Sequence, residues 1–574
     1  MGKSYLSKLS STRYGFWTGL LLLTLVTGCT ANYYRKSADR AAYGAIKANS
    51  PAVRNMDPHF TLEQTNLISL NDFPAGTNAP DYLGENGELE VGAHILRLKD
   101  TLDVAVHHSR DYQNHKEQLY LSALSLALER HQFAPIFSGK GSATVSGENV
   151  PVTTTVSNHL THLVTTNVFF TEDKNIAGSG SINVDWLVAD VGRISAAFTS
   201  DFLRFVTGDS RVAESSALTA TFVSPLLRDA GFKREKEALI QAERNLLYAL
   251  RNFTQFRKDF TVQIARDYYG VLGQRDAARN SFLNYQSSTK NAERTSAMVA
   301  EGRDTTANLG RLEQQKLTSE SSWINAVRSY QQALDDFKIE LGLTVDAHVI
   351  LDEQELEQLQ IQHPKISVAD SIRVALAGRF DYMNAKDEFA DTEREVKLDQ
   401  NLLRPQLDLG ASAGMISNPD RNTGFQLPYP QRYNWSAGLT FDPGFDRTAE
   451  RNNYRSALIA RNRAARNLEQ VEDQIKLDVR NSWRTLDQAE RNYEISESGV
   501  KIAERRVDEQ EMLAEVGRAR AQDQVDAQND LISAKNQRTQ ALVTHTIARL
   551  QFWDNMGILY IKDNGQWEEV SNDK

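Results

Sequence analysis

The sequence predicts an α+β fold in which very long helical hairpins are joined to short strand hairpins. Three observations predict it: a duplicated chain, long proline-free stretches with apolar residues at helical spacing, and short segments in which apolar and polar residues alternate. With 574 residues, the chain is long enough for several domains or for one very elongated domain. The length of the predicted helices favours the elongated form.

The chain contains an internal duplication. Leu96 to Asn114 aligns without gaps with Ile366 to Asn384 at an offset of 270 residues. Further along, Met298 to Arg303 pairs with Met512 to Arg518 at an offset of 214 to 215 residues. Between these two alignments, Ser224-Pro225-Leu226 pairs with Asp442-Pro443-Gly444 at an offset of 218 residues. The drop in offset from 270 to 218 means that the first copy carries an insertion of about 52 residues, roughly Gly147 to Arg211, whose structure the sequence does not predict.

Each copy predicts a helix, a strand hairpin, a very long helix, a tight reversal and a second long helix. No proline occurs from Gly231 to His363 or from Gly444 to the C-terminus, as uninterrupted helical hairpins require. As a helix, Lys233 to Ala300 would be about 100 Å long at 1.5 Å per residue, so it needs neighbours side by side along its length. The apolar stripes predicted to face those neighbours are Leu246, Leu250, Phe253, Phe256, Phe260, Ile264, Tyr268 and Val271 in one copy, and Leu468, Val471, Ile475, Val479, Trp483, Leu486 and Tyr493 in the other.

The strand segments alternate apolar and polar residues. The pattern is clear from Leu407 to Met415, from Tyr433 to Phe441 and, in the first copy, from Leu218 to Phe222, whose partner strand begins after Ile136. Strands of about 9 to 11 residues with this alternation are typical of a transmembrane β-barrel with a wet interior. A soluble, half-buried hairpin shows the same period. Four strands per chain are too few to close a conducting barrel, so the membrane interpretation requires several chains around one barrel.

The N-terminus has the pattern of a bacterial lipoprotein signal peptide. Basic residues precede the apolar run Phe16 to Val26, and Val26-Thr27-Gly28-Cys29 resembles a lipobox whose cysteine carries the acyl chains. The alternative is that Cys29 is simply a buried thiol. It is the only cysteine, so no disulfide can form within the chain. By resemblance to known lipoproteins, Thr30 favours the outer membrane.

These signals divide the chain into six predicted segments. We expect a short helix at Tyr33 to Ile46, followed by an extended, proline-containing linker. The segments are 1–28, signal peptide; 29–93, lipid-anchored extension and linker; 94–350, first repeat; 351–365, linker; 366–560, second repeat; and 561–574, C-terminal tail.

Composition and motifs argue against several function classes. The net charge of −10 does not suit a nucleic-acid binder, which needs a basic face against phosphate. The close histidine pairs, His107-His108 and His159 with His162, lack the spacing and glutamate of a zinc-protease helix. We therefore expect no enzyme activity, no catalytic residue, no metal and no cofactor.

The duplicated unit, the strand led by Pro405, the corner Phe441 to Asp446 and the reversal Ala514 to Gly517 resemble the TolC-like outer-membrane efflux protein family. The resemblance covers roughly Leu96 to Leu559. It implies a homotrimer in which four strands per chain close a twelve-stranded β-barrel in the outer membrane, above a twelve-helix periplasmic tunnel. It also implies a periplasmic adaptor (membrane fusion) protein and an inner-membrane pump of the resistance-nodulation-division or ABC type.

The resemblance also implies site residues at the helical reversals. Asp523 and Asp526, spaced after Gly517 as in the family, would form an acidic ring at the periplasmic aperture, latched by neighbouring arginines. The alternative is that both aspartates lie on a solvated helix face. The first copy lacks matching aspartates, so one ring per trimer is expected. The aperture residues are Asp523, Asp526, Arg518 and Arg520, and the adaptor-facing tips are Gly302, Arg303, Asp304 and Gly517.

The expected function is passive conduction across the outer membrane, from an adaptor and pump to the exterior, by a protein that is lipid-anchored and extends into the periplasm. The alternative is a lipid-anchored coiled-coil protein that spans the periplasm as a spacer without channel activity. The alternative explains the long helices and Cys29, but it does not explain the strand hairpins or the duplication.

Overall fold

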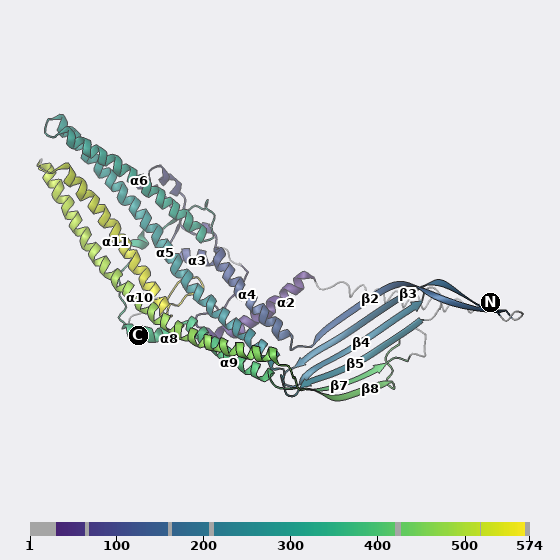
Figure 1. Ribbon diagram of the computed structural model, residues 1–574. Helices are drawn as coiled ribbons and strands as arrows, with labels where there is room; N and C mark the ends of the chain where they lie inside the picture. Colours follow the sequence, from purple (N-terminus) through teal and green to yellow (C-terminus); the bar gives the residue numbers. More distant parts are fainter. Residues whose placement is uncertain are drawn as a thin grey trace. The chain divides into compact units, whose positions relative to one another are not determined.

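A computed structural model describes residues 30–63, 68–158, 163–205, 212–418, 426–516 and 518–568. Its chain contacts divide it into two compact units. The first comprises Met1–Ala127, Ala249–Gln358 and Tyr560–Glu569, and the second comprises Leu128–Tyr248, Leu359–Leu559 and Val570–Lys574. The second unit therefore contains segments from both repeats, whereas the first contains first-repeat segments together with the N-terminal extension and the C-terminal tail (Figure 1).

The helices repeat the predicted duplication in length and order. The long helices α5 (Lys233–Ala300) and α10 (Thr448–Glu515) each have 68 residues, and their partners α6 (Thr306–Glu340) and α11 (Ala521–Asn555) each have 35. The shorter helices precede the strands in both copies. They are α3 (Leu98–His108) and α4 (Arg110–His131) in the first copy, and α8 (Val368–Gly378) and α9 (Phe380–Leu402) in the second.

The predicted apolar stripes are the buried sides of the long helices. In the first unit, Ile264 and Tyr268 of α5 are completely buried, and Tyr112 of α4 packs with its ring centroid 5.3 Å from that of Phe260. In the second unit, α10 packs against α8, α9 and α11 and buries Ile475, Val479 and Leu486. The 3.6-residue period therefore identified the packed faces of these helices.

Six of the described strands form one antiparallel sheet, in the order β2-β3-β4-β5-β7-β8, so the prediction of four strands per chain is wrong. The insertion is the reason, because it supplies β3, β4 and the outer part of β2. A separate parallel pair joins β1 (His94–Leu96) to β6 (Val349–Leu351). The six strands are β2 (Ile136–Asn158), β3 (Leu163–Val188), β4 (Gly192–Phe205), β5 (Val212–Pro225), β7 (Gln406–Ile416) and β8 (Tyr433–Asp442).

The register gives this sheet one apolar and one polar face across β3 to β8. Directly paired residues of an antiparallel sheet lie on the same face, so each row of partners reports the character of that face. One apolar row is Ile182, Phe198, Leu218, Met415 and Tyr433, and one polar row is Asp185, Ser195, Thr221, Ser412 and Ser436. The two added strands therefore continue the alternation of the predicted ones.

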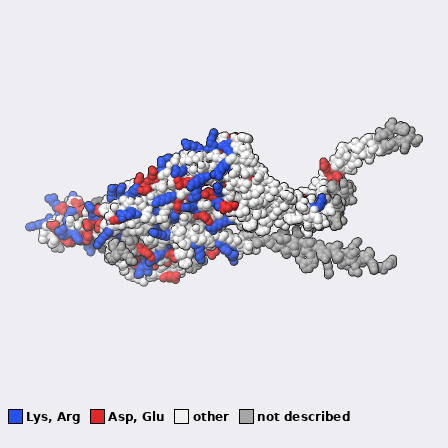
Figure 2. All heavy atoms as spheres, turned by 90° about the horizontal axis from the view of Figure 1, so that it is seen from below, with Lys and Arg blue, Asp and Glu red and all other residues white. Residues whose placement is uncertain are grey.

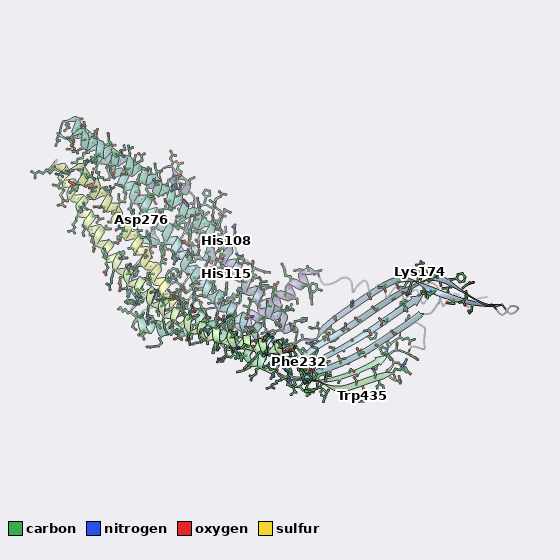
Figure 3. All side chains as sticks on the ribbon, viewed as in Figure 1. His108, His115, Lys174, Phe232, Asp276 and Trp435 are labelled. Carbon is green, nitrogen blue, oxygen red and sulfur yellow. The ribbon has the colours of Figure 1, made fainter. Side chains whose placement is uncertain are left out.

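Strands β2 and β3 extend beyond the rest of the sheet as a two-stranded ribbon. The pairing of β3 with β4 ends at Asn175, next to Lys174 (labelled in Figure 3), whereas β2 and β3 remain paired as far as Asn158 and Leu163. From Gly147 to Asn158 the ribbon is about 40 Å long at about 3.3 Å per residue.

The N-terminal extension is folded onto the first unit. The predicted short helix is present as α2 (Ala31–Asn49), but the expected linker after it forms 3₁₀ turns at Ser50–Ala52, Leu70–Asp72 and Asp81–Glu90. It buries Val53, Met56 and Leu83, among others. Asn55 also exchanges hydrogen bonds with the backbone of Ile561, which fixes the C-terminal tail beside the extension. The short helix α7 (Gln354–Glu357) follows β6.

Candidate functional site

The apolar face of the sheet carries large exposed side chains. On β8, Tyr433, Trp435, Leu439 and Phe441 are each at least 60% exposed, and Phe137 on β2 is 74% exposed. In the view of Figure 2 the strands carry few charged residues, whereas the helices carry many of both signs, and Trp435 is labelled in Figure 3. A contiguous apolar surface of this kind marks contact with a membrane or a partner.

The reversal between α10 and α11 carries the predicted aperture residues. Asp523 and Asp526 lie three residues apart in the first two turns of α11, and both are exposed. Acidic side chains are favourable there because the N-terminus of a helix carries partial positive charge. Asp526 accepts a hydrogen bond from the amide of Gln522 at 2.8 Å.

Arg518 and Arg520 are exposed just before α11. The backbone N–H of Arg518 donates to the carbonyl of Leu513 at 2.8 Å, which closes the end of α10. Among the described residues, neither guanidinium forms an ion pair with Asp523 or Asp526. The four predicted aperture residues thus share one tip without pairing within the chain. Gly517 lies outside the described residues.

In the reversal between α5 and α6, hydrogen bonds within the turn engage both backbone groups and the side chain of Asp304. Gly302 has a φ of +73°, and the N–H of Arg303 donates to the carbonyl of Met298 at 2.9 Å, as in a Schellman helix end. The side chain of Asp304 accepts hydrogen bonds from the N–H of Thr305 at 2.6 Å and from the amide of Asn308 at 2.7 Å. This tip therefore leaves less unpaired charge than the other.

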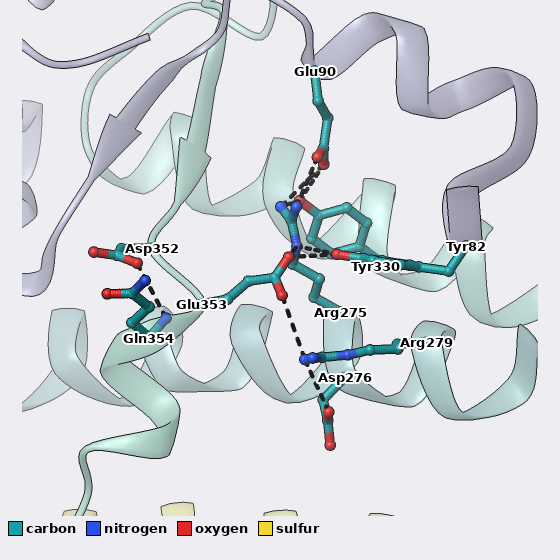
Figure 4. Close-up of polar contacts among 9 residues, drawn as sticks. All are labelled: Tyr82, Glu90, Arg275, Asp276, Arg279, Tyr330, Asp352, Glu353 and Gln354. Carbon is teal, nitrogen blue, oxygen red and sulfur yellow. Dashed lines mark hydrogen bonds and ion pairs between the residues drawn. The ribbon is translucent and has the colours of Figure 1, made fainter. Parts of the chain in front are cut away.

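A buried polar network was not predicted from the sequence (Figure 4). Arg275 of α5 donates to both carboxylate oxygens of Glu90, at 3.1 and 2.8 Å. The same guanidinium donates to the hydroxyl of Tyr330 at 2.8 Å and to Glu353 at 2.5 Å. Tyr82 completes the group by accepting from Arg275 at 2.8 Å. The network joins α5 and α6 to the N-terminal extension and to the segment after β6.

In this network, electrostatics favour an ionised Glu353 and neutral Tyr82 and Tyr330 hydroxyls. Burial opposes ionisation of Glu353, but the nearby Arg275 and Arg279 outweigh it and lower the pKa of that carboxyl. Burial raises the pKa of the Tyr82 and Tyr330 hydroxyls, so both remain protonated donors. A single arginine within a polar helix has no distinctive sequence pattern, and the partners of Arg275 lie far away in sequence.

A second buried polar group lies at the corresponding level of the other hairpin. His363 and Glu490 approach to 3.1 Å, and the completely buried His545 has no hydrogen-bond partner for either ring nitrogen in the described part of the chain. At the 215-residue offset, Glu490 corresponds to Arg275 and His545 corresponds to Tyr330. At these equivalent positions, the first copy therefore has an arginine and a tyrosine, and the second has a glutamate and a histidine.

Two further features concern anchoring and metals. Cys29 lies outside the described residues. No helix within the described ranges is long and apolar enough to cross a membrane. One group in the described part of the chain, Asp57, His59 and Asp563, has ligand atoms within 4.8 Å of one another, but His59 and Asp563 are exposed. Mostly exposed side chains such as these do not make a preformed metal site.

Two long helical hairpins and a sheet with one apolar and one polar face make up the described fold. Residues 371–552 match the family model described as "Outer membrane efflux protein". The resemblance to the outer-membrane efflux family is thereby confirmed. No curated protein sequence matches the chain.

Solved structures share the fold. The outer membrane protein VceC of Vibrio cholerae is 14% identical, with a TM-score of 0.57 over 80% of this chain and 96% of its own. The CmeC outer membrane channel of Campylobacter jejuni is 12% identical, with a TM-score of 0.57 over 83% and 87%. The MtrE outer membrane channel of Neisseria gonorrhoeae is 13% identical, with a TM-score of 0.55 over 80% and 89%.

Proposed function

We propose that this chain is the outer-membrane exit duct of a tripartite efflux or export system. Three copies enclose a water-filled passage, a periplasmic adaptor contacts the helical tips, and an inner-membrane pump of the resistance-nodulation-division or ABC type supplies the energy. Conduction itself is passive and requires no catalytic residue or cofactor. The protein resides in the outer membrane, anchored through Cys29, and extends into the periplasm.

The two-faced sheet carries this proposal. Its apolar face holds exposed tyrosine, tryptophan, leucine and phenylalanine side chains, which are stable against lipid and costly against water. Its opposite face is lined by serine, threonine, asparagine and aspartate, which suits a wet interior. A coiled-coil spacer has no use for such a sheet, so we favour the duct.

The test is reconstitution of the purified full-length protein into a planar bilayer. We expect a trimer that withstands SDS without heating and that produces discrete ionic current steps. A protein that is monomeric in mild detergent and passes no current would contradict the duct and favour the spacer. Identification of the adaptor after chemical cross-linking in native membranes would test the tripartite assignment.

We further propose that Asp523 and Asp526 of three chains form the acidic ring of the periplasmic aperture. The support is their exposure, their spacing at the start of α11 and the absence of ion pairs to Arg518 and Arg520 among the described residues. Replacing both aspartates by alanine should weaken block of the current by divalent cations by about tenfold or more, because clustered carboxylates attract cations. The exposed Glu494→Ala on α10 is the control. Unchanged block in the double variant would exclude this ring but not the duct.

A further inference from the structure

The sheet has two edges, β2 and β8, that no other described strand covers. Unpaired edges are stable in a membrane only when another strand satisfies their backbone groups. The six strands alternate in direction, so β2 and β8 run in opposite directions. An edge β8 can therefore form an antiparallel ladder with the edge β2 of another copy.

We infer that β8 of each chain pairs with β2 of the next, so that three copies close one barrel of eighteen strands rather than twelve. The inference rests on the proposed trimeric duct and specifies its outer half. Six strands contributed by each of three chains give eighteen, and barrel diameter grows about linearly with strand number. The membrane barrel is then about 1.5 times as wide as a twelve-stranded one.

The strands supplied by the insertion, β3 and β4, have the features expected of strands in the wall of a barrel. β3 and β4 are hydrogen-bonded on both sides within the sheet, and their partners keep apolar residues on one face and polar residues on the other. Excluding β3 and β4 from the wall would break two complete ladders. It would also expose Ile182 and Phe198 without lipid contact.

The two edges also match in length and in shape. β8 has 10 residues, and β2 is free of proline from Ile136 to Ser146. Beyond this stretch Pro151 lacks a backbone N–H, so the outer part of β2 suits the free ribbon rather than a closed ladder.

Gly139 and Gly141 leave open space on the apolar face of β2, since a Cβ would meet no atom nearer than 3.8 Å at Gly139 and 3.9 Å at Gly141. The corresponding face of β8 carries Tyr433 and Trp435. Aromatic rings that cover glycines on a neighbouring strand are an established device for stabilising sheets. The edges are therefore complementary, small residues against large ones.

The test uses engineered cysteines in full-length protein, in which Cys29 is the only native cysteine. Ala437→Cys on β8 is combined with one cysteine on the apolar face of β2, and oxidised protein is run on non-reducing SDS gels after heating. At least one combination should give covalent dimers and trimers, whatever the register. The partner positions are Phe137, Gly139, Gly141, Ala143 and Val145, and the matched control is Ser142→Cys, which faces the other side.

A second variant tests the strand count. Val145 and Val212 lie at the same level of the sheet, through Ile176 and Arg204. Replacing residues 146–211 by a short Asn-Gly turn should therefore leave four strands per chain. Polymer exclusion from the outer side should then show a cut-off radius smaller by about a third.

The outcomes separate the two proposals. Cross-linking from β2 to β8 together with the smaller cut-off supports the eighteen-stranded barrel. A conducting, SDS-resistant trimer in which all five cysteine combinations stay uncross-linked overturns this inference and leaves the duct intact. Absence of both the trimer and the current overturns the duct itself.

Discussion

At the scale of single residues, two glycines hold equivalent turns of the two repeats. Gly342 and Gly557 follow α6 and α11 with φ values of +80° and +73°. Gly342 packs against the carbonyl of His108 between α3 and α4, and Gly557 packs against Gly378 between α8 and α9. Each residue therefore fixes a long hairpin to the short helices of its own repeat.

Replacing Gly342 by alanine should destabilise the protein by about 2–4 kcal/mol, because the new Cβ would lie 2.0 Å from the His108 oxygen and the backbone would be strained. Gly557→Ala should cost less, since its nearest contact is 3.0 Å away. Thermal unfolding in detergent measures both. Gly270→Ala, in open space within α5, is the control and should be neutral or stabilising. Equal losses at all three glycines would contradict the steric explanation.

The buried His545 should make stability depend on pH. Burial, together with Arg549 and His363, lowers its pKa to about 4 from an ordinary value of 6.5. The unfolded chain therefore binds a proton more readily than the folded chain between these values, so stability falls as pH decreases from 6.5 to 4, by about 3 kcal/mol in total. His545→Leu should remove this component in unfolding experiments across that range, whereas the exposed His131→Leu should preserve it. An unaltered pH slope in His545→Leu would refute the assignment.

At the scale of elements, the Arg275 network fastens the N-terminal extension to α5. Arg275→Ala leaves the carboxylate of Glu90 buried without its partner, which costs about 3–5 kcal/mol. Limited proteolysis should then cut between Leu70 and Glu90, a segment that we expect to be protected in the native protein. The exposed pair Arg130 and Glu243, 3.0 Å apart, provides the control, because Arg130→Ala should change stability by less than about 1 kcal/mol. Protection of the segment in Arg275→Ala would show that packing alone holds it.

The accuracy of sequence interpretation varied between elements for physical reasons. The long helices were predicted because the 3.6-residue period repeats over many turns in both copies, and β7 and β8 because alternation there is strict. β3 and β4 were missed although Ile182, Val184 and Trp186 do alternate, since glycine and serine weaken the pattern around them. The 3₁₀ turns of the extension have no period to detect. Whether Asp523 and Asp526 of one chain lie close to those of another depends on how the chains assemble, and no pattern in a single sequence reports that arrangement.

At the scale of the whole molecule, two independent attachments to the membrane are proposed, the acyl chains of Cys29 and the apolar face of the sheet. A closed barrel is held in the membrane by its whole apolar circumference, whether or not acyl chains are present. Cys29→Ser, expressed with a cleavable non-lipid signal peptide, should therefore remain in the membrane pellet after an alkaline carbonate wash. Complete release of this variant into the supernatant would contradict membrane insertion of the sheet, and wild-type protein is the reference.

The unequal repeats have a consequence for how such proteins diversify. The long helices kept 68 and 35 residues in both copies, while the first copy gained a hairpin's worth of strand. A strand hairpin can thus be added to one repeat, in evolution or by design, without a change in the length of the long helices. In the proposed duct, the outer opening and the adaptor-binding tips could therefore change independently of each other.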